Sequence, residues 1–312
     1  MCPQRRHTAT SPTQHDWPPM TGQLSGMLGS RIAPLLTISF PDRARMNLND
    51  WQPQTLQLSR PEAHVLVVHL NRPTVANALN TQMGIELRDL WLALTRDAGD
   101  IRCVVYTAVE SKAFCAGGDL KERNGMDVPT WQRQHEIFEE MFWTLLELPI
   151  PVIAAVNGHA YAGGLEMVLC CDFAYGVPQA RFALTEVTIG IMPGAGGTQN
   201  LPRAVGERRA KEIILTGRPF SAQEALDWGV LNRVIEPQDL LPQALDTARR
   251  IAANAPLSVR QAKKSIHFGL QVDVRTGLRY EIEAYNRLIG TEDRLEGIRA
   301  FNEKRAPKFE GR

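Results

Sequence analysis

The chain has 312 residues, of which 44% are hydrophobic, and its 35 basic and 34 acidic residues leave a formal net charge of +1. This length and composition are typical of a folded protein with one large core, or with one core and an appended helical part. The near-zero net charge excludes a general electrostatic attraction to nucleic acid or to an anionic membrane. The longest apolar runs fall far short of the roughly 20 residues that a membrane-spanning helix needs. We therefore expect no nucleic-acid partner and no membrane.

The five cysteines are odd in number and lack the Cys-x-x-Cys spacing of zinc and redox motifs. Two of them, Cys103 and Cys170, lie in apolar runs. This pattern is typical of reduced thiols in a cytosolic or mitochondrial-matrix compartment. We predict a cytoplasmic protein without a metal site, or a matrix protein if its N-terminal stretch is a transit peptide.

The N-terminal stretch differs from the rest of the chain. Residues 1–45 contain arginines among serine, threonine, glutamine and proline, with few acids and no sustained periodicity. A targeting peptide has a similar composition, but Met46 opens a more ordinary start just before the first strand. We predict that residues 1–48 form a disordered or dispensable extension.

Strand-like and helix-like segments alternate after this stretch. Residues 64–70 are rich in β-formers and end before Pro73, which cannot donate to a ladder. Apolar residues then recur at helical spacing over 81–97, with Asn80 or Thr81 available as the N-cap. Residues 102–107 are typical of a buried strand.

A second copy of this pattern follows a small-residue loop at 114–120. It contains a helix around 134–148, a strand at 152–156, a glycine loop at 157–164 and a short apolar helix. The recurrence of strand, glycine loop and helix predicts an α/β fold in which successive turns stack around one core and their loops converge on one side.

The glycine loops are candidates for backbone recognition of a ligand. Gly163 and Gly164 precede a helix, so their N–H groups lie at the positive end of its dipole. Either loop alone could equally be a tight turn. Asp119 is better explained as the N-cap of the next helical turn than as a catalyst. A third loop, 193–198, lacks the P-loop and dinucleotide motifs, and we interpret it as shaping and packing the site.

Two glutamates, Glu166 and Glu186, interrupt apolar and glycine-rich sequence. A carboxylate is rarely buried unless a partner pairs with it or a reaction uses it, so both are candidate acid and base groups. Two loop amides can stabilise an oxyanion on a carbonyl, and two carboxylates can hold and activate one water. Together these groups predict a carbonyl substrate that forms an enolate.

Four segments resemble the crotonase (enoyl-CoA hydratase/isomerase) superfamily: Phe114-Cys-Ala-Gly-Gly-Asp-Leu, Ala154-Ala-Val-Asn-Gly-His-Ala, Gly163-Gly-Leu-Glu and Pro193-Gly-Ala-Gly-Gly-Thr-Gln. The tail from Arg294 to Arg305 extends the resemblance, which covers about Asp50 to the C-terminus. It implies a spiral of ββα turns at 49–245 and a C-terminal helical trimerisation region at 246–312. Relatives of this kind form homotrimers or hexamers built as dimers of trimers.

The resemblance also implies a role for each site residue. The amides of Gly118 and Gly163 would form an oxyanion hole for an acyl-CoA thioester. Glu186 would protonate C2 of a trans-2-enoyl-CoA while Glu166 orients or deprotonates the water that adds to C3. The product would be a 3-hydroxyacyl-CoA, and no cofactor is implied beyond the coenzyme A of the substrate. The other implied substrate contacts are Ala116, Gly117, Asp119, Leu120, Lys121, Gly164 and Lys304. The resemblance leaves open whether Lys304 reaches the coenzyme A phosphates within its own subunit or from a neighbouring one.

The resemblance leaves two alternatives to a general hydratase of fatty-acid or acyl-CoA breakdown. The segments Leu120-Lys-Glu-Arg and Asp293-Arg-Leu-Glu-Gly also resemble methylglutaconyl-CoA hydratases of leucine catabolism. Some of those proteins bind RNA through a lysine-rich helix, but 81–97 contains no lysine, so we predict no RNA binding. Ala162 replaces a glycine that is common in hydratases, and we expect little consequence.

Overall fold

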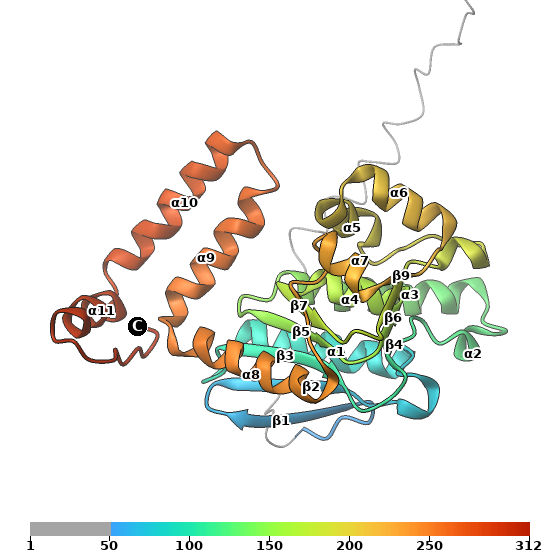
Figure 1. Ribbon diagram of the computed structural model, residues 1–312, viewed down its shortest axis with the longest axis horizontal. Helices are drawn as coiled ribbons and strands as arrows, with labels where there is room; N and C mark the ends of the chain where they lie inside the picture. Colours follow the sequence, from blue (N-terminus) through green and yellow to red (C-terminus); the bar gives the residue numbers. More distant parts are fainter. Residues whose placement is uncertain (1–50) are drawn as a thin grey trace, which may run out of the picture. The chain divides into compact units, whose positions relative to one another are not determined.

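The structure, a computed structural model, describes residues 51–312 (Figure 1). The extension predicted at residues 1–48 lies outside this part of the chain. Residues 51–312 contain two β-sheets, one with the strand order β1-β2-β3-β5-β7-β10 and one with the order β4-β6-β8-β9. Helices surround both sheets, so the predicted α/β class is confirmed.

The larger sheet forms the centre of the core. Its strands β2, β3, β5, β7 and β10 pair in parallel, and β1 pairs antiparallel with β2. Every residue of β3 and β5 is buried, which explains why both strands are continuous apolar runs rather than alternating ones. The strand bounds are β1 Leu56–Glu62, β2 Val65–Leu70, β3 Cys103–Ala108, β5 Val152–Val156, β7 Phe173–Gly176 and β10 Arg233–Val234.

The smaller sheet contains β4 (Ala113–Cys115), β6 (His159–Tyr161), β8 (Arg181–Ala183) and β9 (Phe220–Ser221). Strands β4, β6 and β8 are parallel neighbours, and β9 closes the sheet in the antiparallel sense. Along the chain, β3, β5 and β7 of the larger sheet are followed directly by β4, β6 and β8 of the smaller one. Two strands and the helices after them thus make one turn of a spiral, as the sequence predicts.

The predicted helices are present in the structure, but some of them begin or end at other residues than predicted. Asn80 caps the first long helix through a bond from the Met83 amide. The next long helix begins at Val128, earlier than predicted, because Asp127 caps it and Pro129 is suited to a first turn. The helical bounds are η2 Pro73–Val75, α1 Thr81–Arg96, α2 Leu120–Arg123, α3 Val128–Leu146, α4 Gly163–Cys170, η3 Glu186–Ile189, α5 Gly197–Val205, α6 Glu207–Thr216, α7 Ala222–Asp227, α8 Pro237–Ala253, α9 Pro256–Gly269, α10 Val274–Ile289 and α11 Glu292–Asn302.

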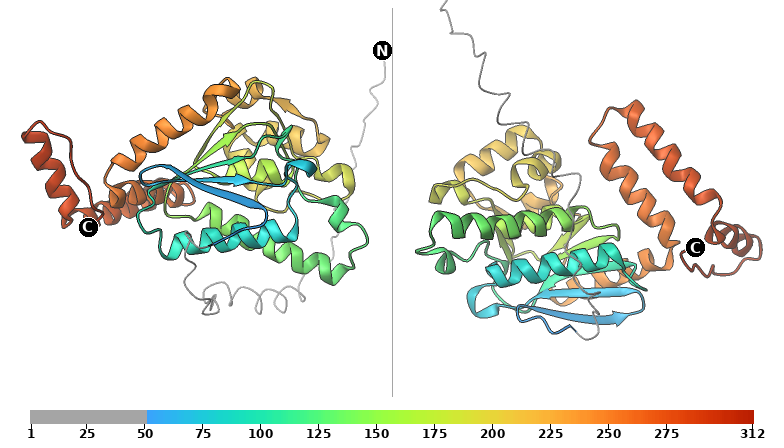
Figure 2. Two further views of the ribbon diagram at one scale, coloured as in Figure 1. Left: turned by 90° about the horizontal axis from the view of Figure 1, so that it is seen from below. Right: turned by 180° about the vertical axis from the view of Figure 1, so that it is seen from behind.

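Helix α8 packs on strands β2, β3, β5 and β7 and leads to the C-terminal helices α9, α10 and α11 (Figures 1 and 2). The boundary predicted at residue 245 falls inside α8. Lys263 of α9 ties these helices to the core, since its Nζ donates to the Ile150 carbonyl at 3.0 Å and to Asp172 at 2.7 Å. Among residues 51–312, no helix has the length and apolar character needed to cross a bilayer.

Leu90 of α1 is fully buried in the core, so truncating it tests how much this helix depends on packing. We expect Leu90→Ala to lower the free energy of unfolding by about 2–5 kcal/mol, because it removes methyl groups and leaves a cavity. Leu215→Ala on α6 is the matched control, since that side chain is 72% exposed. Urea denaturation of both variants measures the difference, and equal losses would contradict this description of the core.

Candidate active site

Three loops meet at one edge of the smaller sheet. Gly118 follows β4, Gly163 follows β6 and Glu186 follows β8. Because these strands are parallel neighbours, the segments after their carboxyl ends lie side by side. Residues far apart in the sequence are thereby brought to one place.

These loops border a cavity of about 540 Å³. Gly118, Gly163, Glu166 and Glu186 all line it. Its walls are otherwise mainly apolar and aromatic, contributed in part by Phe138, Phe142, Ile191 and Met192. A concave apolar site with a few polar groups is typical of a small-molecule pocket.

The amides of Gly118 and Gly163 are free to bind a ligand. The flanking residues Gly117 and Asp119 form the backbone bonds to Leu79, which leaves the Gly118 N–H between them. Gly163 is the first residue of α4, where an N–H has no partner within the helix. Within residues 51–312, neither amide donates a hydrogen bond.

Two other glycines in these loops allow close packing of backbone. A Cβ on Gly164 would lie 2.2 Å from the carbonyl oxygen of Cys115. Gly117 has a positive φ of 92°, and a Cβ there would lie 2.7 Å from the Ala162 Cβ. Gly117 and Gly164 do not line the cavity, so their predicted substrate contacts remain predictions.

Ala162 is strained, which the sequence alone did not indicate. Its φ of 50° and ψ of −124° lie in a region that residues with a Cβ rarely adopt. Glycine would adopt this conformation at lower cost. The backbone at Ala162 sets the direction of the Gly163 amide, so the strain lies directly beside the site.

Glu166 is a buried carboxylate with a defined orientation. Its side chain projects from α4, the residue is 3% exposed, and Oε1 accepts N–H groups from Ala195 and Gly197, each at 2.8 Å. Burial raises the pKa of Glu166, while these two amides act in the opposite direction by stabilising its charge. The 193–198 loop therefore does more than shape the site, because it supplies the two donors that hold this carboxylate.

Glu186 lies in the same cavity but lacks the two hydrogen bonds from a neighbouring loop that Glu166 accepts. It begins η3, it is buried, and its Oε2 has no hydrogen-bond partner within residues 51–312. Burial, and then the charge of Glu166, raise the pKa of Glu186 to about 7. One carboxyl group thus has two donors that offset part of the cost of burying its charge, and the other is poised to hold a proton near neutral pH.

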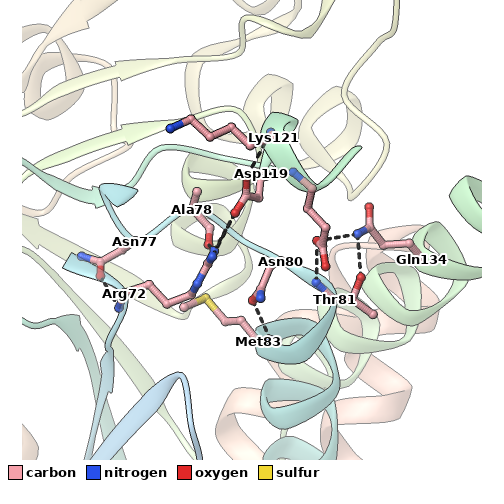
Figure 3. Close-up of polar contacts among 10 residues, drawn as sticks. Arg72, Asn77, Ala78, Asn80, Thr81, Met83, Asp119, Lys121 and Gln134 are labelled. Carbon is pink, nitrogen blue, oxygen red and sulfur yellow. Dashed lines mark hydrogen bonds and ion pairs between the residues drawn. The ribbon is translucent and has the colours of Figure 1, made fainter. Parts of the chain in front are cut away.

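Asp119 and Arg72 hold the first loop in place (Figure 3). The Asp119 carboxylate accepts from the amides of Lys121 and Glu122, which confirms the predicted N-cap, and it pairs with Arg72 at 3.0 Å. The pairing and the two amide bonds hold the pKa of Asp119 below its usual range despite burial. Its carboxylate is therefore engaged within the protein.

The remaining predicted contacts divide into two groups. Ala116 and Leu120 line the cavity. Lys121 and Lys304 are exposed and do not line it. Their contact with coenzyme A stays a prediction.

Sequence reasoning expected pocket walls from residues 122–134 but did not single out Arg123, which lines the cavity. It also missed the amides of Ala195 and Gly197. The signal for the amides was a glycine-rich loop directly before α5, which marks a close backbone approach. Among residues 51–312, no cluster of three or more His, Cys, Asp or Glu side chains could hold a metal ion.

The thiol of Cys115 lies under the site at the end of β4. It is fully buried, and burial raises its pKa to about 12. The pKa of Cys103 is raised to about 12 for the same reason, and burial also raises those of Cys170 and Cys171. All four thiols are free in the described chain, and burial disfavours their thiolate forms.

The profile of the Enoyl-CoA hydratase/isomerase family matches residues 60–312. A crystal structure of enoyl-CoA hydratase from Bacillus anthracis is 44% identical, with a TM-score of 0.81, covering 83% of this chain and 100% of that one. The short-chain-enoyl-CoA hydratase of Clostridium acetobutylicum is 39% identical over 80% of this chain and 95% of its own length. The (E)-benzylidenesuccinyl-CoA hydratase of Thauera aromatica is 39% identical over 83% of this chain and 99% of its own length.

This fold and this pair of carboxyl groups beside two free amides define a crotonase-type enzyme. The chain belongs to the enoyl-CoA hydratase/isomerase family.

Gly163 and Gly164 allow a matched test of close packing. We expect Gly164→Ala to destabilise the protein, because its Cβ would meet the Cys115 carbonyl at 2.2 Å, a backbone atom that cannot move aside cheaply. Gly163→Ala should fold normally, since its nearest neighbour is Phe142 at 3.7 Å. Thermal unfolding of the two variants distinguishes them, and equal melting temperatures would contradict the predicted clash.

The raised pKa of Glu186 predicts a pH-dependent loss of stability. Between the ordinary glutamate value and about 7, the native state keeps a proton that the unfolded chain has released, so stability falls as pH rises through this window. Glu186→Gln removes this loss and should gain melting temperature relative to wild type as the pH increases. Glu207→Gln is the control and should run parallel to wild type in this window, because a bond from Lys211 lowers the pKa of Glu207 and confines its titration to pH values below the ordinary glutamate value. Parallel curves for Glu186→Gln and wild type would exclude a raised pKa.

Proposed function

We propose that the protein is an enoyl-CoA hydratase that adds water to the double bond of a trans-2-enoyl-CoA and forms a 3-hydroxyacyl-CoA. One observation carries the proposal. Two buried glutamates and two unbonded backbone amides line the same cavity. Family membership and the names of the relatives support this reaction class. We place the reaction in acyl-CoA breakdown.

In this mechanism, the amides of Gly118 and Gly163 donate to the thioester carbonyl oxygen. Negative charge grows on that oxygen as the enolate forms, and fixed donors stabilise it without having to reorient. Gly163 lies at the N-terminus of α4, where the helix dipole adds a favourable potential. These amides therefore bind the transition state more strongly than the substrate.

The two carboxyl groups then divide the proton transfers. Glu166, held as an anion by the Ala195 and Gly197 amides, orients the water and accepts its proton as the oxygen bonds to C3. Electrons of the C2–C3 double bond pass into the enolate, and protonated Glu186 delivers a proton to C2. With both carboxyl groups on one side of the bound enoyl group, water and proton would add to the same face, which is the syn addition that we propose.

The binding of coenzyme A and the oligomeric state are further parts of the proposal. Ala116 and Leu120 would contact the thioester end, and Lys121 and Lys304 would approach the phosphates. We infer a homotrimer, or a dimer of trimers, formed through the C-terminal helices. Helix α10 supports this, because its exposed side chains include an apolar series at helical spacing, Val274, Leu278, Ile282, Tyr285 and Ile289.

The proposed mechanism predicts the effect of removing each carboxylate. Glu166→Gln and Glu186→Gln should each lower kcat for crotonyl-CoA hydration by about 10²–10⁴-fold, because each variant loses one proton-transfer group. Loss of the enoyl-thioester absorbance measures the rate. Glu136→Gln, an exposed change on α3, controls for the substitution itself. A wild-type protein that hydrates no enoyl-CoA, or full activity in either cavity variant, would refute the proposal.

A further inference from the structure

We propose that this site, acting as the hydratase proposed above, is built for enoyl groups that carry a free carboxylate at their distal end. Arg123 is the residue that binds this carboxylate. The proposal rests on the hydratase function for its chemistry, and on the position and unmet hydrogen-bonding capacity of Arg123 for its specificity.

Arg123 is a cation inside the cavity that holds both glutamates. It is the last residue of α2, and its side chain is only partly accessible to solvent. A Cβ on Gly118 would lie 3.2 Å from Arg123 Nη1 and 3.3 Å from Cζ. The guanidinium therefore lies beside the residue whose amide faces the thioester, within reach of a short acyl chain.

The surrounding residues fix the direction of this side chain. Arg123 Nε donates to Gln134 Oε1 at 2.8 Å, and Gln134 is 3% exposed. The Gln134 amide nitrogen in turn donates to Thr81 Oγ1 at 2.7 Å and to Glu122 Oε2 at 2.9 Å (Figure 3). The Gln134 amide group is thus held in one orientation, with its oxygen toward Arg123.

Two aromatic rings hold the plane of the guanidinium. Arg123 Cζ lies 4.4 Å from the centre of the Trp131 ring and 5.5 Å from that of Phe138. Stacking of this kind favours a cation and orders its planar group. With Nε occupied and the plane fixed, Nη1 and Nη2 remain available as a pair of donors.

Arg123 has no direct ion pair in the described chain, although the charge of the neighbouring Glu122 favours its cationic form. Within residues 51–312, Nη1 and Nη2 make no hydrogen bond or ion pair. The adjacent Glu122 carboxylate is already engaged by Gln134 and the Thr81 amide. Burial of the guanidinium lowers the pKa of Arg123, which reflects the cost of its desolvation. A carboxylate offers the planar geometry that two guanidinium donors bind best.

An uncharged acyl chain would complete the burial of this cation without pairing it, which is unfavourable. The cavity walls contributed by Phe138, Phe142, Ile191 and Met192 are apolar, so they contact the carbon chain and offer no anion of their own. The other candidate anion is a phosphate of coenzyme A. We assign Arg123 to the acyl carboxylate because it lines the cavity of the two glutamates.

The test compares two pairs of thioesters in which a distal carboxylate is replaced by an uncharged, apolar group of similar size. Glutaconyl-CoA and 5-methylhex-2-enoyl-CoA are the reactive pair, with a carboxylate in one and an isopropyl group in the other. Glutaryl-CoA and 5-methylhexanoyl-CoA are their saturated counterparts. These two cannot be hydrated, so calorimetry measures their binding alone. Wild type should prefer the carboxylate in kcat/KM and in affinity.

We expect Arg123→Met to lower the preference for the carboxylate, in both measurements, by about 100-fold, because it removes a charge-assisted pair of hydrogen bonds. Arg123→Lys should retain part of the preference, and Arg133→Met, an exposed arginine on α3, should retain all of it. The Arg123→Lys variant keeps a positive charge at this position, so it still tests the proposal if Arg123→Met does not fold.

Three outcomes would overturn the assignment. Equal losses on charged and uncharged thioesters would mean that Arg123 binds coenzyme A or only supports the loop. An unchanged preference in Arg123→Met would exclude it as the carboxylate ligand, and a wild type that favours the isopropyl group would exclude the substrate class. If nothing is hydrated while glutaryl-CoA still binds through Arg123, the hydratase function fails and this inference survives.

Discussion

The site depends on the burial of one carboxylate, Glu166, and on the two backbone amides that satisfy it. A buried anion without donors would take up a proton, and the donors here come from Ala195 and Gly197, far along the chain. This interaction joins α4 to the segment before α5. Folding of the smaller sheet and ionisation of the site are therefore linked.

The charge on Glu166 has a second effect, on Glu186. Two carboxyl groups in one apolar cavity do not both ionise easily, and Glu186, whose Oε2 has no partner in the described chain, keeps its proton to a higher pH. Glu186 therefore has a pKa suited to a general acid near neutral pH, while Glu166 is suited to orient water. The difference arises from the surroundings of the two glutamates: two amides stabilise the charge of Glu166, while burial and the charge of Glu166 disfavour that of Glu186.

The sequence predicted those parts of the protein that local pattern determines. The strands at 102–107 and 152–156 were recognisable because they are buried on both faces, and Glu166 and Glu186 were recognisable because charge is unexpected in apolar sequence. The roles of Ala195, Gly197 and Arg123 were not predictable, because each depends on which distant segment the spiral brings alongside. In the sequence, Arg123 is indistinguishable from an ordinary surface arginine on a short helix. Only the positions of Trp131 and Gln134 in the fold show that its side chain is held at the cavity.

Cys115, whose carbonyl packs against Gly164, has a bearing on the chemical durability of the protein. Oxidants and alkylating agents attack the thiolate, and the pKa of this thiol, raised to about 12, leaves almost none of that form at neutral pH. Full burial also denies reagents access to the sulfur. The floor of the site should thus resist peroxide and thiol-directed inhibitors.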